Sequence, residues 1–165
     1  MTTPRARSRL VVTLAVSATV GAFFAVPQAD AQRHAQSPTH TTVRLASNED
    51  RDHLLALVNR SRHSRGLPRL RLNHQLSREA LKHSRAMARS DAISHTPNLA
   101  DLIRGVGGTV FGEDVGKGRA MVGIRDAWLR RPDTRSILLD ARFHHVGVGV
   151  IHIGGFYWVT LQAFD

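Results

Sequence analysis

The C-terminal end of the chain constrains the fold more than any other segment. Two β-rich runs, residues 145–153 and 156–164, are joined by Gly154-Gly155, and a glycine pair between such runs predicts a tight two-residue hairpin. Gly147 and Gly149 alternate along the first run, so both lie on one face of the predicted strand. Because that face carries no side chains there, a bulky element, which we expect to be a helix, can pack close over it.

A first helix is predicted from Ser47, its N-cap, to the stop signal at Gly66. Acidic residues follow the cap, and an apolar stripe over residues 54–58 marks the face that packs inward. We expect the charged residues of the opposite face to meet water, namely Arg51, Asp52, Arg60 and Arg62.

A second helix begins at Asn73, its predicted N-cap, and apolar or small residues recur at helical spacing behind it. The predicted buried face consists of Leu76, Ala80, Ser84 and Met87. Thr96 and Pro97 fit the N-cap and first position of a short third helix that runs through Ile103.

A fourth helical pattern spans about residues 119–129, with Val122 and Trp128 among its apolar positions. Because the helices come first and an antiparallel hairpin comes last, this order predicts an α+β fold rather than a parallel βαβ sheet. The length of 165 residues fits one domain.

Residues 1–31 have the pattern of a secretory signal peptide. A basic start precedes an uninterrupted apolar run at residues 10–26, and Ala29-Asp30-Ala31 gives a small-residue cleavage pattern before Gln32. The apolar run is at the lower limit for spanning a bilayer, so an uncleaved anchor is the alternative. Residues 32–46 are polar and aperiodic, which predicts a flexible leader. We therefore expect a secreted or envelope-associated protein whose folded domain is residues 47–165, with no membrane span after cleavage.

Composition excludes several kinds of site. The chain has no cysteine, which rules out disulfides, thiolate zinc sites and a cysteine nucleophile. Its formal net charge is +10, and arginines gather at the end of the first helix: Arg60, Arg62, Arg65, Arg69 and Arg71. No aromatic residue is interleaved for base stacking, so we expect no specific nucleic-acid partner. Cell-wall polymers and anionic lipid head groups are the partners expected outside the cytoplasm, and a solvated basic surface is the alternative.

Several short segments, in a fixed order, resemble one family. They are residues 54–59 and 66–70, Ser94-His95-Thr96, Gly112–Gly116, Ala127–Leu129, Ile137–Leu139, Val146–Gly149 and Tyr157–Thr160. Together they resemble a bacterial CAP domain, of the superfamily of cysteine-rich secretory proteins, antigen 5 and pathogenesis-related 1 proteins. The resemblance covers about residues 48–164 and implies a three-layer α-β-α sandwich with a central antiparallel sheet.

The family cleft holds up to two histidines and two glutamates, which can bind a divalent metal. By resemblance, His95 matches the first histidine and Glu113 the acid of a Gly-Glu-Asn motif, in which Asp114 replaces the asparagine. Thr134 stands where the second histidine belongs, and no acid matches the second glutamate. The cleft residues implied here are therefore His95, Glu113, Asp114 and Thr134, with two of the family's four groups missing.

Two ligands hold zinc weakly, so we expect no firmly bound cofactor and at most a weakly bound divalent metal (Zn) at His95 and Glu113. No positioned nucleophile accompanies this pair. We therefore expect a monomeric binding or interaction module at the cell envelope or outside the cell rather than an enzyme. Its ligand, a lipid or a cell-wall polymer, is left open. The alternatives are a metal- or water-dependent hydrolase with His95 and Glu113 as catalytic residues, and a purely structural wall protein.

A second histidine group occurs at His144, His145 and His152. On a strand, residues 145 and 152 face opposite sides, so nothing groups all three. We expect surface or strand-edge histidines rather than a metal site.

Overall fold

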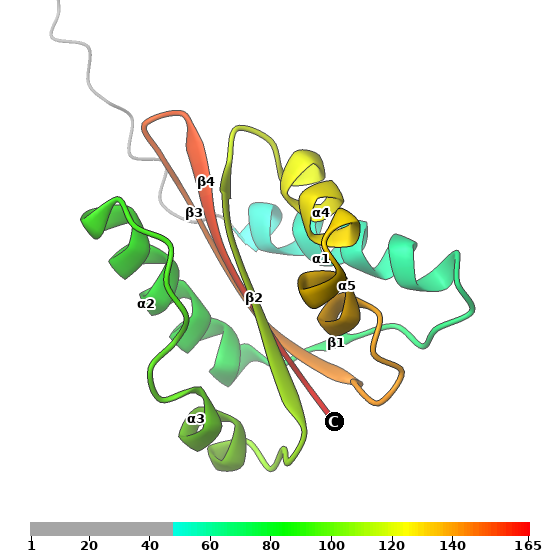
Figure 1. Cartoon of the computed structure of the whole chain (residues 1–165). Helices are drawn as coiled ribbons and strands as arrows, with labels where there is room; N and C mark the ends of the chain where they lie inside the picture. Colours follow the sequence, from blue (N-terminus) through cyan, green and yellow to red (C-terminus); the bar gives the residue numbers. More distant parts are fainter. Residues whose placement is uncertain (1–47) are drawn as a thin grey trace, which may run out of the picture. The chain divides into compact units, whose positions relative to one another are not determined.

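Five helices and four strands make up residues 48–165, the part of the chain that the structure, a computed structural model, describes (Figure 1). In chain order they are α1 (Asn48–His63), β1 (Arg71–Leu72), α2 (His74–Ser90), α3 (Leu99–Gly105), β2 (Phe111–Gly118), α4 (Met121–Arg130), α5 (Pro132–Leu138), β3 (His145–Ile153) and β4 (Phe156–Phe164). The predicted signal peptide (1–31), leader (32–46) and Ser47 cap lie outside the described residues.

The C-terminal hairpin is present with its predicted bounds. β3 and β4 pair antiparallel along their whole length, with His145 opposite Phe164. Gly154 and Gly155 have φ angles of 60° and 77°, the left-handed conformation that a type I′ turn needs at both positions. β2 pairs antiparallel with the other side of β4, and the short β1 pairs parallel with β3, giving the order β1-β3-β4-β2.

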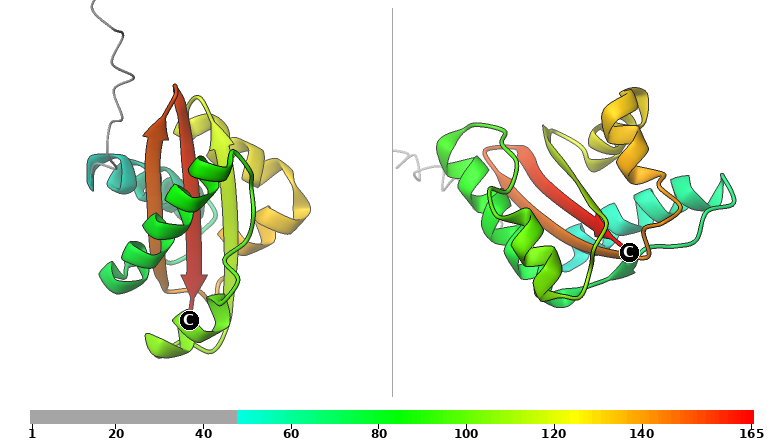
Figure 2. Two further views of the ribbon diagram at one scale, coloured as in Figure 1. Left: turned by 90° about the vertical axis from the view of Figure 1, so that its left-hand side faces the viewer. Right: turned by 60° about the horizontal axis from the view of Figure 1, so that its bottom comes forward.

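Helices cover both faces of this sheet (Figure 2). α2 lies over β3 and β4 on one face with α3 next to it, whereas α1, α4 and α5 lie on the other. The larger apolar core lies on the second side and includes Leu54, Trp128, Val148 and Leu161. The expected α+β fold with α-β-α layers is confirmed, and the sheet departs from purely antiparallel only at β1. Within residues 48–165, no helix has both the length and the apolar composition needed to cross a bilayer.

Glycines on β3 let α2 approach the sheet closely. A Cβ atom at Gly149 would lie 2.2 Å from the carbonyl carbon of Ala80, and one at Gly147 would lie 2.5 Å from Leu76 Cγ. Any larger side chain at these positions would push the helix away. The expectation of a helix packed over Gly147 and Gly149 is therefore confirmed.

The second helix also matches its prediction. The Asn73 side chain accepts a hydrogen bond of 2.9 Å from the Leu76 backbone N–H, as an N-cap does. The predicted face, Leu76, Ala80, Ser84 and Met87, is buried.

Two local expectations are wrong, and one strand was not predicted. α3 begins at Leu99 after Asn98, because Thr96 gives its backbone N–H and its hydroxyl to Glu113 instead of capping a helix. Val122 is 46% exposed, because the buried face of α4 consists of Met121, Ile124 and Trp128. Residues 111–118, for which no secondary structure was predicted, form the edge strand β2.

Arg62 is the clearest departure from the sequence pattern, because it is fully buried instead of facing water. Its guanidinium donates to four backbone carbonyls at 2.8–3.0 Å: those of Pro68, Leu138, Asp140 and Phe143. Burial lowers the pKa of Arg62, and the nearby Asp140 carboxylate partly restores it. This arginine therefore belongs to the core and not to the basic surface.

We predict that Arg62→Met lowers the free energy of unfolding by about 3–5 kcal/mol, since four carbonyls lose their donors and a buried site loses a fitted group. Urea unfolding followed by circular dichroism measures this change. Arg60→Met, at an exposed position of the same helix, is the control and should cost less than about 0.5 kcal/mol. Equal costs for the two variants would contradict a structural role of the Arg62 contacts.

Candidate functional site

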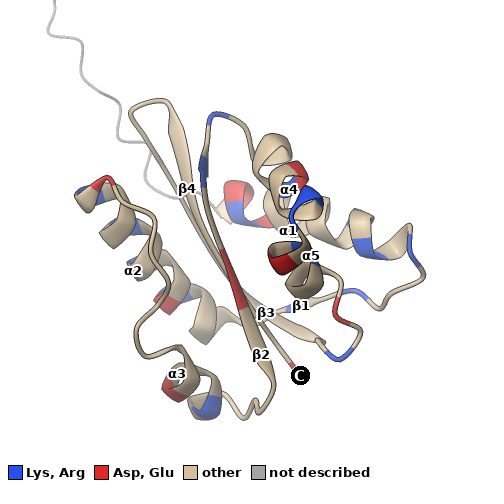
Figure 3. Ribbon diagram, viewed as in Figure 1, with Lys and Arg blue, Asp and Glu red and all other residues tan. Residues whose placement is uncertain are grey.

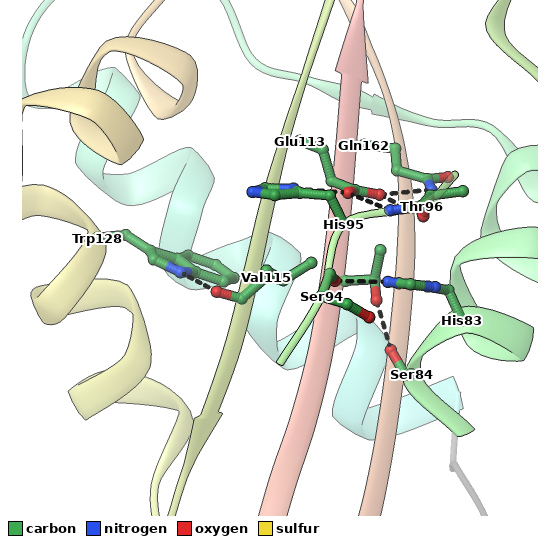
Figure 4. Close-up of polar contacts among 10 residues, drawn as sticks. His83, Ser84, Ser94, His95, Thr96, Glu113, Val115, Trp128 and Gln162 are labelled. Carbon is green, nitrogen blue, oxygen red and sulfur yellow. Dashed lines mark hydrogen bonds and ion pairs between the residues drawn. The ribbon is translucent and has the colours of Figure 1, made fainter. Parts of the chain in front are cut away.

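The carboxylate of Glu113 accepts four hydrogen bonds at the candidate site (Figure 4). Glu113 lies on β2, and its side chain is only 2% exposed. Oε1 accepts from the Thr96 backbone N–H at 2.8 Å and from His95 Nδ1 at 2.9 Å. Oε2 accepts from the Thr96 hydroxyl at 2.5 Å and from Gln162 Nε2 at 2.9 Å. The carboxylate thus ties the loop after α2 to the strands β2 and β4.

These contacts set the charge of Glu113. Burial alone raises the pKa of a carboxyl group. Here the hydrogen bonds from Thr96, Gln162 and His95 outweigh burial, so the pKa of Glu113 is lowered. The group is therefore an anion at neutral pH and accepts every hydrogen bond it makes.

His95 has the opposite exposure, since 71% of its side chain is accessible. Because Glu113 only accepts hydrogen bonds, Nδ1 of His95 carries the hydrogen, and Nε2 of the neutral ring keeps a free lone pair. The loop that carries it is held by His83, whose Nε2 lies 2.7 Å from the Ser94 carbonyl oxygen. Figure 4 shows the His95 ring next to Glu113, with its far end turned toward the side of β2 on which Trp128 lies.

A cavity of about 300 Å³ lies at this edge of the sheet. His95 lines it together with Thr134, Asp133 and Trp128. Thr134 donates its hydroxyl hydrogen bond to the Trp128 carbonyl at 2.8 Å, and Trp128 Nε1 donates to the Val115 carbonyl at 3.0 Å. Thr134, which the resemblance implies as the counterpart of the second histidine, therefore shares one cavity with His95, and its hydroxyl is already bonded to the backbone.

Asp114 points to the opposite face of β2 from Glu113, because neighbouring residues of a strand point to opposite faces. It is fully buried, and neither carboxylate oxygen has a hydrogen-bond partner in residues 48–165. Burial, followed by the negative charges of Asp133 and Glu113, raises the pKa of Asp114 to about 8. Asp114 is thus a neutral acid at pH 7 and does not line the cavity.

The arrangement offers few metal ligands. Across the described residues 48–165, no group of three or more His, Cys, Asp or Glu side chains could hold a metal ion. Asp133 lines the cavity but forms an ion pair with Arg131 at 2.8 Å. At this cavity His95 Nε2 offers a lone pair to a metal, whereas both oxygens of Glu113 already accept hydrogen bonds.

Two residues of the site were missed by sequence reasoning. Gln162 reaches Glu113 because it lies opposite it in the β2–β4 register, a pairing that requires knowing that residues 111–118 form a strand. Thr96 was assigned to a helix cap, although its place next to His95 was a signal that it could share a partner with it. His95 and Glu113, which the resemblance placed in one cleft, are in contact at 2.9 Å, and the function of the pair stays a prediction.

The other three histidines do not come together as one group. The His145 ring stacks on Phe164 with ring centroids 5.2 Å apart, and the His152 ring stacks on Tyr157 at 4.4 Å. Each is paired with its own cross-strand neighbour, as the register of the hairpin requires.

We predict that Asp114→Asn removes a pH dependence of stability. The folded chain keeps the Asp114 proton up to about pH 8, whereas an unfolded aspartate releases it near 3.8, so folding loses stability as pH rises between these values. The slope is at most about 1.4 kcal/mol per pH unit. Thermal unfolding at pH 4, 6 and 8 should show the variant gaining on the parent as pH rises. Asp101→Asn, an exposed aspartate, is the control, and an Asp114→Asn curve parallel to the parent's would refute the buried acid.

Comparisons with known proteins show which family the chain belongs to. A sequence model of the cysteine-rich secretory protein family, CAP, matches residues 55–162. An SCP-domain extracellular protein of Bacillus anthracis is 28% identical, with a TM-score of 0.62 over 72% of this chain and 41% of its own. A cysteine-rich secretory protein of Staphylococcus aureus is 22% identical, with a TM-score of 0.55 over 71% of this chain and 39% of its own. An outer surface protein of Borrelia burgdorferi is 15% identical, with a TM-score of 0.66 over 74% of this chain and 98% of its own.

The chain spans less than half the length of the B. anthracis and S. aureus proteins, so it is similar to one part of each. No curated protein matches it significantly. The relatives are described as extracellular or as an outer surface protein. Since the family pattern extends from α1 to the end of β4 and the relatives have the same fold, the chain belongs to the cysteine-rich secretory protein (CAP) family.

Proposed function

We propose that the chain is an exported CAP protein that works as a monomeric binding module at the cell envelope or outside the cell. The observation that carries this proposal is the composition of the cavity: His95 faces a threonine, Thr134, where a second imidazole would be needed for a strong metal site. A cavity of about 300 Å³ with one free imidazole suits the binding of a small group better than metal-assisted chemistry. Its ligand is a lipid or part of a cell-wall polymer.

Export is supported by two observations. Residues 1–31 have the three parts of a signal peptide, and the relatives are described as extracellular or outer surface proteins. The folded residues contain no cysteine, so the domain needs no oxidising compartment and its core alone stabilises it.

A hydrolase that uses His95 and Glu113 is the second candidate. The buried carboxylate orients the imidazole and leaves Nε2 free at the cavity, which is the geometry of a general base. Against it stand the lack of a nucleophile hydrogen-bonded to His95 within residues 48–165 and the commitment of Glu113 to other donors. A water molecule or a metal would have to supply the attacking oxygen.

We predict that zinc stabilises the parent protein little and that Thr134→His increases the effect. Stabilisation follows RT ln(1 + [L]/Kd), so a site that gains a second imidazole in the same cavity should show a larger zinc-dependent rise in Tm. At zinc concentrations near 100 Kd the gain is about 2.7 kcal/mol. Thermal unfolding with and without zinc chloride measures it.

Thr134→Asn, which changes the same position without adding an imidazole, is the matched control and should behave like the parent. His95→Ala in the Thr134→His background should abolish the gain. A large zinc-dependent shift of the parent that His95→Ala removes would contradict the binding-module proposal and favour the metal-dependent hydrolase.

We predict that the mature chain begins at Gln32 or within a few residues of it. The small residues of Ala29-Asp30-Ala31 end the segment that signal peptidase recognises. Mass spectrometry of the protein recovered from culture medium gives the start directly. A membrane-retained species that begins at Met1 would show that residues 10–26 act as an anchor.

A further inference from the structure

A second hollow lies at the opposite edge of the sheet from His95. β1 and β2 are the two outermost strands, and the His95 cavity is next to β2. Along β1 and α1 lie two adjoining cavities of about 890 and 480 Å³, which share Ala56, Asn59 and Arg69 as lining residues. We call the two together the basic groove. It is larger than the His95 cavity and has no lining residue in common with it.

The charge of the groove is almost wholly positive. Arg60, Arg69 and Arg71 line it and are exposed, and no ion pair between described residues joins any of them to an acid. The acid of its lining, Asp52, is already paired with Arg51 at 2.8 Å. Figure 3 shows basic residues on α1 and on the segment that leads to β1. Three cations without an ion-pair partner in residues 48–165 create a positive field that an external anion can neutralise.

Buried polar side chains hold the wall of this groove in place. Asn59 Nδ2 donates to the Leu70 carbonyl at 3.1 Å, and its Oδ1 accepts from the Leu70 N–H at 2.8 Å. Arg62 fixes the neighbouring Pro68 carbonyl at 2.8 Å. Leu70 is buried while Arg69 and Arg71 on either side of it are exposed, so the fixed backbone presents both arginines outward. The groove is therefore preorganised, which lowers the entropic cost of binding.

The shape of the site selects among anionic partners. A groove encloses an extended chain, whereas a flat bilayer would contact only its rim. Binding of single-stranded nucleic acid without base readout relies on aromatic stacking platforms, and no Phe, Tyr or Trp lines the groove. Aliphatic side chains such as Leu55 and Leu72 offer an apolar floor on which the carbon skeleton of a sugar or polyol chain can lie.

We propose that the basic groove binds an extended anionic polysaccharide or polyol polymer, one that carries a phosphodiester or carboxylate group on each repeat. Arg60, Arg69 and Arg71 bind the anionic groups, and guanidinium suits both because it offers paired N–H donors to two oxygens. This site is separate from the His95 cavity. The proposal adds a ligand class to the envelope role proposed above. It rests on that role only in assuming that the protein is exported to where such polymers occur.

Direct binding by the purified protein tests the groove without reference to location. The probes are poly(glycerol phosphate) for the phosphodiester, polygalacturonate for the carboxylate, neutral dextran as a blank, and phosphatidylglycerol vesicles for a membrane. Isothermal titration calorimetry should show binding to at least one anionic polymer and none to dextran. The affinity should fall about tenfold or more between 50 and 200 mM salt.

A charge-matched pair of variants locates the site. R60Q/R69Q/R71Q should weaken polymer binding about tenfold or more, whereas R89Q/R130Q/R135Q, which removes the same charge from exposed arginines outside the groove, should change it less than threefold. Circular dichroism checks that each variant is folded, and R71Q alone replaces the triple variant if it is not. His95→Ala tests whether the polymer binds in the His95 cavity instead of the groove.

Several outcomes would overturn the proposal. Equal losses in the two triple variants would mean that diffuse charge, not the groove, attracts the polymer. Binding to vesicles but to neither polymer would make the surface a membrane contact. Loss of binding in His95→Ala would move the polymer to the other edge of the sheet. By contrast, polymer binding through the groove by a protein that is retained inside the cell would support the groove proposal and contradict only the proposed export.

Discussion

The buried guanidinium of Arg62 is the interaction on which both edges of the sheet depend. It joins the end of α1 to the connection before β1, through Pro68, and to the last residue of α5 and the segment that follows it, through Leu138, Asp140 and Phe143. A planar group with five donors can serve four carbonyls at once, which a lysine ammonium cannot do. Because Pro68 lies in the wall of the basic groove and α5 begins in the wall of the His95 cavity, one side chain fixes the geometry of both.

Glycines determine how closely the helices pack against the sheet. On one face Gly147 and Gly149 allow α2 to touch β3. On the other face a Cβ atom at Gly116 would lie 2.8 Å from Ile124 and 3.3 Å from Trp128, so this glycine lets α4 approach β2. That approach brings the Trp128 indole within hydrogen-bonding distance of the Val115 carbonyl. The cavity near His95 is therefore bounded by an α4 that is held close to the strand carrying Glu113.

The sequence predicted what local rules determine and missed what long-range pairing determines. The hairpin over residues 145–164, the Asn73 cap and the buried face of α2 follow from turn chemistry and periodicity, and all are present. β2 was not recognised because its glycines serve packing against α4 and α5 and dilute the strand pattern. Arg62 was assigned to the solvent side because its carbonyl partners include residues 76–81 positions away in the sequence. The partners of Glu113 were hidden for the same reason, since Gln162 becomes its neighbour only through the β2–β4 register.

The two members of the His95–Glu113 pair contribute to different properties of the protein. Glu113 keeps three of its four hydrogen bonds without His95, two from Thr96 and one from Gln162. Charge-assisted hydrogen bonds to a buried carboxylate contribute about 1.5–3 kcal/mol each, so the loop after α2 remains attached to the sheet when the imidazole is absent. The exposed His95 contributes little to that attachment, because most of its ring is in water. Stabilising the fold is therefore a sufficient role for Glu113. It is not a sufficient role for His95, whose imidazole is oriented by a carboxylate and lines a cavity.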